Sequence, residues 1–224
     1  MDRPTIAQEP SSDCPYCPRL AAFRDANRAA FPDWFNAPVP SFGDDNARLL
    51  IVGLAPGLRG ANRTGRPFTG DHAGILLYAT LAKFGFASGE YGASPEDALR
   101  LVDCMITNAV RCVPPANKPE TVEIGTCRQF LMQRIAVLPN LKAILVLGRI
   151  AHETVLRALG LRIAAFPFGH GAIHALPGSS VAVFDSYHCS RYNTNTGMLT
   201  TEMFEAVFKN ARTYLDQTSS SNVD

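Results

Sequence analysis

Residues 51–84 form the stretch that most limits how this chain can fold. They begin at the end of a short apolar run, LLIV at residues 49–52, and finish in an apolar helical pattern, ILLYATLAKF. The loop between them is rich in glycine, with Gly53, Gly57, Gly60, Gly65 and Gly70. Glycine lets backbone approach a ligand closely, and a strand-to-helix loop presents N–H groups, often to an anion. We therefore expect a buried strand, a functional loop and a helix here.

Two phosphate-binding patterns do not fit this loop. A Walker A loop requires Gly-Lys-Ser or Gly-Lys-Thr after its four-residue spacer. Gly60 and Gly65 have that spacing, but Arg66 and Pro67 follow, and proline offers neither a hydroxyl nor an N–H. The dinucleotide fingerprint G-x-G-x-x-G does not occur in the loop either. The loop is therefore a glycine-rich connection of another kind.

Apolar runs and helical patterns alternate along the rest of the chain. Further strands are predicted at residues 104–110, 141–148 and 181–185, with a hairpin at residues 163–176. Helices are predicted at residues 18–30, 71–85, 120–137, 149–159 and 201–216, and a short one at 94–101 from a capping box.

Strands that alternate with helices pair in parallel. We therefore predict a single α/β domain over residues 13–216, an α/β/α sandwich around a four-stranded, mainly parallel central sheet. The polar segments at residues 1–12 and 217–224 are expected to be disordered tails.

The chain is close to neutral, with a formal net charge of +1 at pH 7. A nucleic-acid-binding surface would therefore have to be local. Any one basic residue alone would be an ordinary surface charge, but several lie in loop-like contexts: Arg59, Arg63, Arg66, Arg111, Lys118 and Arg191. No apolar run reaches the roughly 18 residues of a membrane span, and the N-terminus lacks a signal-peptide core. We expect a cytoplasmic protein that contacts no membrane.

Six cysteines raise the question of a metal site. Disulfides are not expected in a reducing compartment. Cys14 and Cys17 have the C-x-x-C ligand spacing, and Cys112 and Cys127 flank a proline-rich loop and the start of a helix. Two local and two distant thiolates suit a site that holds either a structural zinc or an iron–sulfur cluster. The spacing alone does not decide between the two.

A second loop, HCSRYNTNTG at residues 188–197, also follows a buried strand and precedes a helix. His188 is either a turn residue or a catalytic electrophile, and its position favours neither. Asn108 interrupts the apolar strand predicted at residues 104–110. It is either a hydrogen-bonded core residue or a ligand-binding group at the carboxyl end of a strand, where α/β proteins bind ligands.

Taken in chain order, these segments resemble the uracil-DNA glycosylase superfamily, and most closely its family-5 (UDGb-type) iron–sulfur branch. GLAPG followed by GANRTGRPFTGD resembles the first motif, and TNAVRCVPP resembles the stretch that bears the asparagine. Residues 188–197 resemble the second motif, H-P-S-x-x-N-x-x-T-G. Cys189 departs from the proline of that motif, and Met198 stands where a basic residue is expected.

The resemblance implies a DNA repair glycosylase that flips a deaminated base out of DNA and hydrolyses its N-glycosidic bond. Under that hypothesis His188 and backbone N–H groups stabilise the anionic leaving base. Asn108 hydrogen-bonds the base edge, and Phe68 stacks on the base instead of serving only as a core residue. Asp71 is the candidate for positioning water, although aspartate is also a favoured N-cap at a helix start. The base-binding loop comprises Gly53, Leu54, Ala55 and Gly57.

The resemblance also implies a cofactor and DNA contacts. A [4Fe–4S] cluster would be held by Cys14, Cys17, Cys112 and Cys127. Arg191 and Tyr192 would enter the duplex and fill the vacated space, while Ser190 and Asn193 would contact flanking phosphates.

The substrate range and the type of reaction follow from two further positions. Leu54 replaces the polar or acidic residue of other branches, which favours a wider range of bases, with hypoxanthine and xanthine as candidates beside uracil. Neither motif loop contains a lysine that could form a Schiff base. We therefore predict a monofunctional glycosylase without strand cleavage, acting as a monomer.

Two other classes of function compete with this hypothesis. One is an iron–sulfur DNA-binding module that recognises damaged DNA without cleavage, against which the presence of Asp71, Asn108 and His188 argues. The other is a nucleotide-dependent enzyme, against which the failed Walker A match and the missing acidic magnesium site argue.

Overall fold

The computed structural model describes residues 9–220 and contains one six-stranded mixed sheet. Four strands at its centre run parallel, in the order β5 (Cys104–Asn108), β2 (Leu49–Gly53), β6 (Ala143–Leu147) and β8 (Ala182–Ser186). Two short antiparallel strands, β1 (Phe42–Gly43) and β7 (Ile173–Ala175), close its edges. The predicted α/β/α sandwich and its four parallel strands are confirmed, and the two edge strands are additions.

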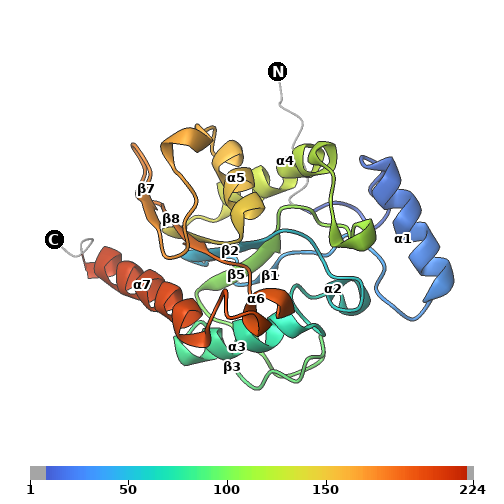
Figure 1. Ribbon diagram of the computed structural model, residues 1–224, viewed down its shortest axis with the longest axis horizontal. Coiled ribbons are helices and arrows are strands. Elements are labelled where there is room, and N and C mark those ends of the chain that lie inside the picture. The colour runs from blue at the N-terminus through green and yellow to red at the C-terminus, as the bar shows by residue number, and fades with distance from the viewer. Residues whose placement is uncertain (1–8, 221–224) are drawn as a thin grey trace.

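Helices cover both faces of the sheet (Figure 1). α4 (Thr121–Val137) and α5 (Arg149–Ala158) lie on one face, while α3 (His72–Lys83) and α7 (Thr201–Ser220) lie on the other. α1 (Pro18–Ala30) stands to one side of the sandwich. Each of these five helices begins within two residues of its predicted start.

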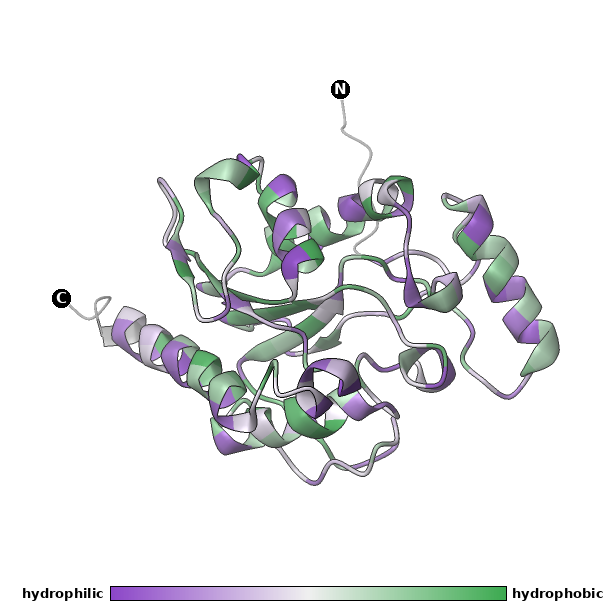
Figure 2. Cartoon of the chain, in the orientation of Figure 1, coloured by the Kyte–Doolittle hydropathy of each residue, from purple (hydrophilic) through white to green (hydrophobic). Residues whose placement is uncertain are grey.

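Alternating side chains of the central strands supply two separate cores. Leu49 and Ile51 of β2 pack toward α3 and α7, whereas Leu50 and Val52 pack toward α4 and α5. Because both faces are covered, all five residues of each central strand are buried. The strands accordingly appear as a largely hydrophobic centre between helices with mixed faces (Figure 2).

Two local predictions are wrong. Residues 94–101 do not form a helix, since they run through turns into β4 (Arg100–Leu101), which pairs with β3 (Ala87–Ser88). The carboxylate of Asp97, the last residue of the Ser94-Pro95-Glu96-Asp97 capping box from which that helix is predicted, instead binds the guanidinium of Arg66. Residues 163–176 do not form a hairpin either, because a 3₁₀ turn at Ile163–Ala165 is followed by β7, which pairs with β8.

The ends of the domain differ from the predicted tails where they are described. Glu9 forms ion pairs with Arg111 at 2.9 Å and with Arg134 at 2.7 Å, so the chain is already tied to the domain at this residue. α7 continues past residue 216 to Ser220. Residues 1–8 and 221–224, which belong to the predicted tails, lie outside the described residues. Among the helices of residues 9–220, none has the length and apolarity to cross a membrane.

Candidate active site

The carboxyl ends of β2, β5 and β8 open into a cavity of about 640 Å³. The loop after β2 includes α2 (Ala61–Thr64), the loop after β8 leads into α6 (Arg191–Asn195), and the loop after β5 includes a 3₁₀ turn, Pro115–Asn117. Together they line the cavity with Leu54, Ala55, Pro56, Gly57, Leu58, Arg59, Gly60, Ala61, Phe68, Asp71, His72, Ala73, Asn108, Asn117, His188, Ser190 and Arg191. Both predicted motif loops therefore meet at one site.

Asn108 reaches the cavity from the last position of β5. It pairs in register with Gly53 of β2, is 3% exposed, and its Oδ1 has no hydrogen-bond partner among the described residues. A Cβ atom on Gly53 would collide with this Oδ1 and would lie 2.7 Å from Cζ of Phe68. The glycine is required for close approach of these two side chains. A buried oxygen without a partner is costly unless a ligand supplies a donor.

Phe68 lies against this asparagine in an unusual backbone conformation. Its φ of +53° is left-handed, which costs a non-glycine residue on the order of 1 kcal/mol. The ring is almost wholly buried and its centroid lies 6.0 Å from that of the His188 ring, at an interplanar angle of 31°. Phe68 therefore forms one wall of the cavity.

Asp71 uses its two carboxylate oxygens differently. Oδ1 accepts a hydrogen bond from the N–H of Gly74 at 3.1 Å and caps α3. Oδ2 faces the glycine loop, where a Cβ atom on Gly60 would lie 2.5 Å away and one on Gly57 would lie 3.3 Å away. The helix-cap role is thus confirmed, and it leaves the second carboxylate oxygen without this capping bond.

His188 follows β8 with its backbone fixed and its ring available. The amide of Asn193 donates to the His188 carbonyl at 2.8 Å, and the Ser190 hydroxyl caps α6 by accepting from the Asn193 N–H. Within residues 9–220 no group hydrogen-bonds the His188 ring. Burial lowers the pKa of this ring, although the negative charge of Asp71 opposes the shift, so a neutral imidazole faces the cavity at neutral pH.

Two contacts between the motif loops were not identified from the sequence. The ring Nε2 of His72, the first residue of α3, lies 3.0 Å from the hydroxyl of Thr194 in α6. Cys189, which replaces the motif proline, is fully buried, and its thiol donates to the Ala73 carbonyl at 3.5 Å. Burial raises the pKa of this thiol to about 12, so it is a packing group and not a reactive thiolate.

The basic residues divide into two groups. Arg59, Arg63, Lys118 and Arg191 are exposed, and Tyr192 beside Arg191 is 73% exposed. By contrast, Arg111 is 1% exposed and paired with Glu9, while Arg66 is 5% exposed and paired with Asp97. The prediction that these last two arginines are candidates for nucleic-acid contact is wrong, because their charges are consumed inside the domain.

The four predicted ligand cysteines gather at a second, smaller cavity between α1, α4 and the exit of β5. Cys14, Cys17, Cys112 and Cys127 line it, and all four are free thiols. Burial, together with the nearby thiols, raises the pKa of Cys17 to about 11 and that of Cys112 to about 12. These sulfurs would become thiolates readily only with a bound cation.

The positions of these sulfurs can be compared with those of a zinc site. Four thiolates around one tetrahedral zinc lie about 3.8 Å apart. In the described part of the chain, however, the cysteines form no three-ligand group whose atoms lie within 4.8 Å of one another. The described cysteines are therefore not drawn together as the ligands of one zinc ion would be.

One group of possible metal ligands does meet that distance limit, namely His152, His174 and Asp185. His152 Nδ1 lies 2.7 Å from Asp185 Oδ1, and His174 Nε2 lies 2.9 Å from Oδ2. Ligand atoms about 2.0–2.1 Å from a tetrahedral metal are about 3.3 Å apart, so these contacts are hydrogen bonds. The group fastens α5 and β7 to the end of β8, three residues before His188.

Comparison with known proteins places this architecture in a family. Residues 40–212 match the model of the Uracil DNA glycosylase superfamily. The chain belongs to the uracil-DNA glycosylase superfamily. It is similar to the Type-5 uracil-DNA glycosylase of Thermus thermophilus, with 46% identity over 95% of this chain and 98% of that relative. It is also similar to the Type-5 uracil-DNA glycosylase of Pyrobaculum aerophilum, with 39% identity over 89% of this chain and 88% of that relative.

Similarity extends to a second type within the superfamily. The Type-4 uracil-DNA glycosylase of Archaeoglobus fulgidus is 32% identical over 67% of this chain and 69% of its own length. The superfamily match spans both motif loops and the strand that carries Asn108. It begins after Cys14 and Cys17, which are therefore outside the superfamily match.

Proposed function

We propose that this protein is a DNA glycosylase that flips uracil, or another deaminated base, out of DNA and hydrolyses its N-glycosidic bond. The observation that carries the proposal is the unpartnered Oδ1 of Asn108 inside the cavity, beside the ring of Phe68. Such an acceptor needs a donor from a ligand, and the ring offers a stacking surface for a planar one.

The chemistry of deaminated bases meets both requirements. Uracil, hypoxanthine and xanthine each present a ring N–H beside a carbonyl oxygen, whereas cytosine and adenine present a bare ring nitrogen beside an amino group. The Asn108 oxygen accepts from that N–H, and its amide nitrogen donates to the neighbouring carbonyl. This edge is common to all three deaminated bases, and apolar Leu54 adds no polar contact that would restrict the site to uracil. We therefore propose a substrate range wider than uracil.

Cleavage of the N-glycosidic bond leaves negative charge on the departing base and positive charge on the sugar. The neutral His188 ring donates an N–H to the base anion as its charge develops, which stabilises the transition state more than the ground state. Oδ2 of Asp71 orients the water molecule that attacks the positively charged sugar and accepts a proton from it. Since neither motif loop contains a lysine, the product is an abasic site without strand cleavage.

The cysteine group would hold a [4Fe–4S] cluster through Cys14, Cys17, Cys112 and Cys127. When bound, the cluster supplies four iron–thiolate bonds that crosslink the start of α1, the exit of β5 and the body of α4. Because the loop after β5 also carries Asn117 into the active-site cavity, this crosslink supports one wall of the site. Its role in the proposal is structural.

The DNA itself would lie across the exposed arginines. Arg59 and Arg191 line the mouth of the cavity, where they neutralise phosphates beside the lesion, and Tyr192 is exposed enough to enter the duplex. The side chains of Ser190 and Asn193 already form hydrogen bonds, Ser190 as the cap of α6 and Asn193 to the His188 carbonyl. A phosphate contact from either would be additional to these bonds. We propose a cytoplasmic monomer whose partner is DNA that contains a deaminated base.

The test uses duplex oligonucleotides with one uracil, hypoxanthine or xanthine, incubated with purified protein and then treated with alkali. Strand breaks only after alkali, lost in His188→Ala and reduced at least tenfold in Asn108→Ala, are expected. Asn140→Ala, which alters an exposed asparagine far from the cavity, is the matched control. Tight binding without any base release would instead support the DNA-binding module. Breaks before alkali would contradict the monofunctional reaction.

A further inference from the structure

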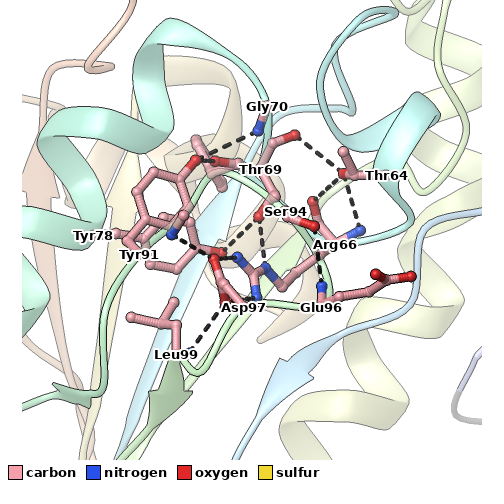
Figure 3. Close-up of polar contacts among 12 residues, drawn as sticks. Thr64, Arg66, Thr69, Gly70, Tyr78, Tyr91, Ser94, Glu96, Asp97 and Leu99 are labelled. Carbon is pink, nitrogen blue, oxygen red and sulfur yellow. Dashed lines mark hydrogen bonds and ion pairs between the residues drawn. The ribbon is translucent and has the colours of Figure 1, made fainter.

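The segment at residues 89–99 connects β3 to β4 and belongs to neither recognised motif, yet it contacts the loop that carries Phe68. Asp97 accepts two hydrogen bonds from Arg66, Nη1 to Oδ1 and Nη2 to Oδ2, both at 2.7 Å. The Nε of Arg66 donates to the hydroxyl of Thr69 at 2.7 Å. Figure 3 shows this guanidinium between the carboxylate and the loop. A bidentate pair of this kind fixes both distance and orientation.

Because this ion pair is buried, it fixes the segment at residues 89–99 against the loop that carries Phe68. The side chains of Arg66 and Asp97 are 5% and 7% exposed. The guanidinium carbon of Arg66 lies 5.2 Å from the Phe42 ring centroid, 5.5 Å from that of Tyr78 and 5.8 Å from that of Tyr91. The N–H groups of Gly92 and Leu99 complete the hydrogen bonds to the carboxylate.

Two tyrosines hold the loop backbone on either side of Phe68. The hydroxyl of Tyr91 donates to the Phe68 carbonyl at 3.2 Å and accepts from the Gly70 N–H at 3.4 Å. The hydroxyl of Tyr78 donates to the Pro67 carbonyl at 2.6 Å. The two rings stack on each other with centroids 4.5 Å apart. Every residue from Arg66 to Gly70 therefore has a bond to this network.

A left-handed phenylalanine persists only where its surroundings over-determine it. We propose that Tyr91 and the Arg66–Asp97 pair are positioning residues for base excision, which hold Phe68 in the conformation that stacks on the flipped base. None of the three lines the cavity, so they act through Phe68 and not on the substrate. The inference rests on the proposed function and assigns a catalytic purpose to the segment at residues 89–99.

Tyr91→Phe is the deciding variant because it removes one hydroxyl and retains the ring stacked on Tyr78. Loss of both hydrogen bonds of this hydroxyl, one to the Phe68 carbonyl and one from the Gly70 N–H, lowers the single-turnover excision rate by about fivefold to twentyfold. The affinity for duplex DNA stays within about twofold of wild type. Tyr214→Phe is the matched control, since its hydroxyl also donates to a backbone carbonyl, that of Ser180 at 3.0 Å, far from the site.

A double-mutant cycle with Phe68→Ala separates positioning from general structure. If Tyr91 acts through Phe68, Tyr91→Phe has no further effect in the Phe68→Ala background. Effects that multiply, or a Tyr91→Phe rate equal to wild type, would overturn the inference. Asp97→Asn should show the same dependence on Phe68, provided that its melting temperature shows it to be folded.

Hydrogen exchange gives a readout that needs no activity. The amides of residues 66–74 should exchange faster in Tyr91→Phe than in wild type, while the rest of the chain and the Tyr214→Phe protein do not change. Unchanged exchange of these amides would refute the claim that Tyr91 fixes the loop around Phe68. A wild-type protein that releases no deaminated base would refute the proposed function instead, so the two failures are distinguishable.

Discussion

Replacing Gly60 with alanine should disable the enzyme through Asp71, although Gly60 contributes no side chain. A Cβ atom at Gly60 would lie 2.5 Å from Oδ2 of Asp71 and 2.9 Å from its Cγ. The same atom at Gly57 would lie 3.3 Å from that oxygen. The two glycines therefore form a matched pair, in which one substitution must displace the carboxylate and the other need not.

The size of the displacement follows from ordinary contact distances. Carbon and oxygen atoms in contact lie about 3.4 Å or more apart, so Oδ2 must retreat by about 0.9 Å in Gly60→Ala and by about 0.1 Å in Gly57→Ala. A displacement of about 1 Å at a reacting group costs on the order of 10²-fold in rate. Gly60→Ala should therefore lose about 100-fold in single-turnover excision, and Gly57→Ala less than about threefold. Loss of the α3 cap would also cost Gly60→Ala about 1 kcal/mol in unfolding free energy.

Single-turnover excision of uracil from duplex DNA measures the rate, and thermal unfolding measures the fold. Asp71→Asn should lose as much activity as Gly60→Ala, and the double variant should lose no more than either, because both changes remove the same function. If Gly60→Ala retained activity within about threefold of wild type, Asp71 would not be the residue that positions water. A double variant much slower than both singles would equally contradict the shared route.

Three further predictions concern stability, the cluster and DNA. Because its hydrogen bonds from Arg66 lower the pKa of Asp97 to about 2 from an ordinary 3.8, the folded carboxyl binds a proton less readily than the unfolded one. Its stabilising contribution is therefore present above about pH 4 and lost as the pH falls through 2, and urea unfolding should show a smaller loss over this range in Asp97→Asn. Cys17→Ser should lower the iron and sulfide content of purified protein and its melting temperature, whereas an iron-free, zinc-loaded wild type would contradict the cluster. Arg191→Gln should weaken DNA binding and reduce the slope of log affinity against log salt by about 1, as a lost phosphate contact requires; an unchanged slope would remove Arg191 from the DNA surface.

The central architecture could be predicted because its signals are local and strong. Each parallel strand is a short apolar run, and α3 and α4 begin at residues that cap them, Asp71 and Glu120. The edge strands β1 and β7 contain two and three residues, too few for a pattern to appear. Their place in the sheet is decided by neighbours that are distant in sequence.

Two of the failed predictions, the helix at residues 94–101 and the DNA contacts of Arg66 and Arg111, share one physical cause, which is an ion pair between residues far apart in the chain. In its local context Asp97 resembles part of a helix cap. Its partner Arg66 lies 31 positions away, and the ion pair holds the segment in turns instead of a helix. Arg111 lies in a proline-rich loop that resembles a DNA-binding surface, but Glu9, 102 positions away, neutralises it inside the domain. Local sequence shows the charge of a residue and not the partner that consumes it.

The same reasoning explains why the residues of the site could be identified while their geometry could not. Asn108 and Asp71 each have one polar atom available at the cavity, and for each a glycine from another part of the chain leaves the necessary space, Gly53 for the first and Gly60 for the second. A glycine in a loop indicates that the backbone needs freedom or room, but it does not name the side chain that occupies the room. Each of these glycines leaves space for one polar atom, Gly53 for Oδ1 of Asn108 and Gly60 for Oδ2 of Asp71. Substitution of either glycine should therefore impair the chemistry as strongly as removal of that polar atom.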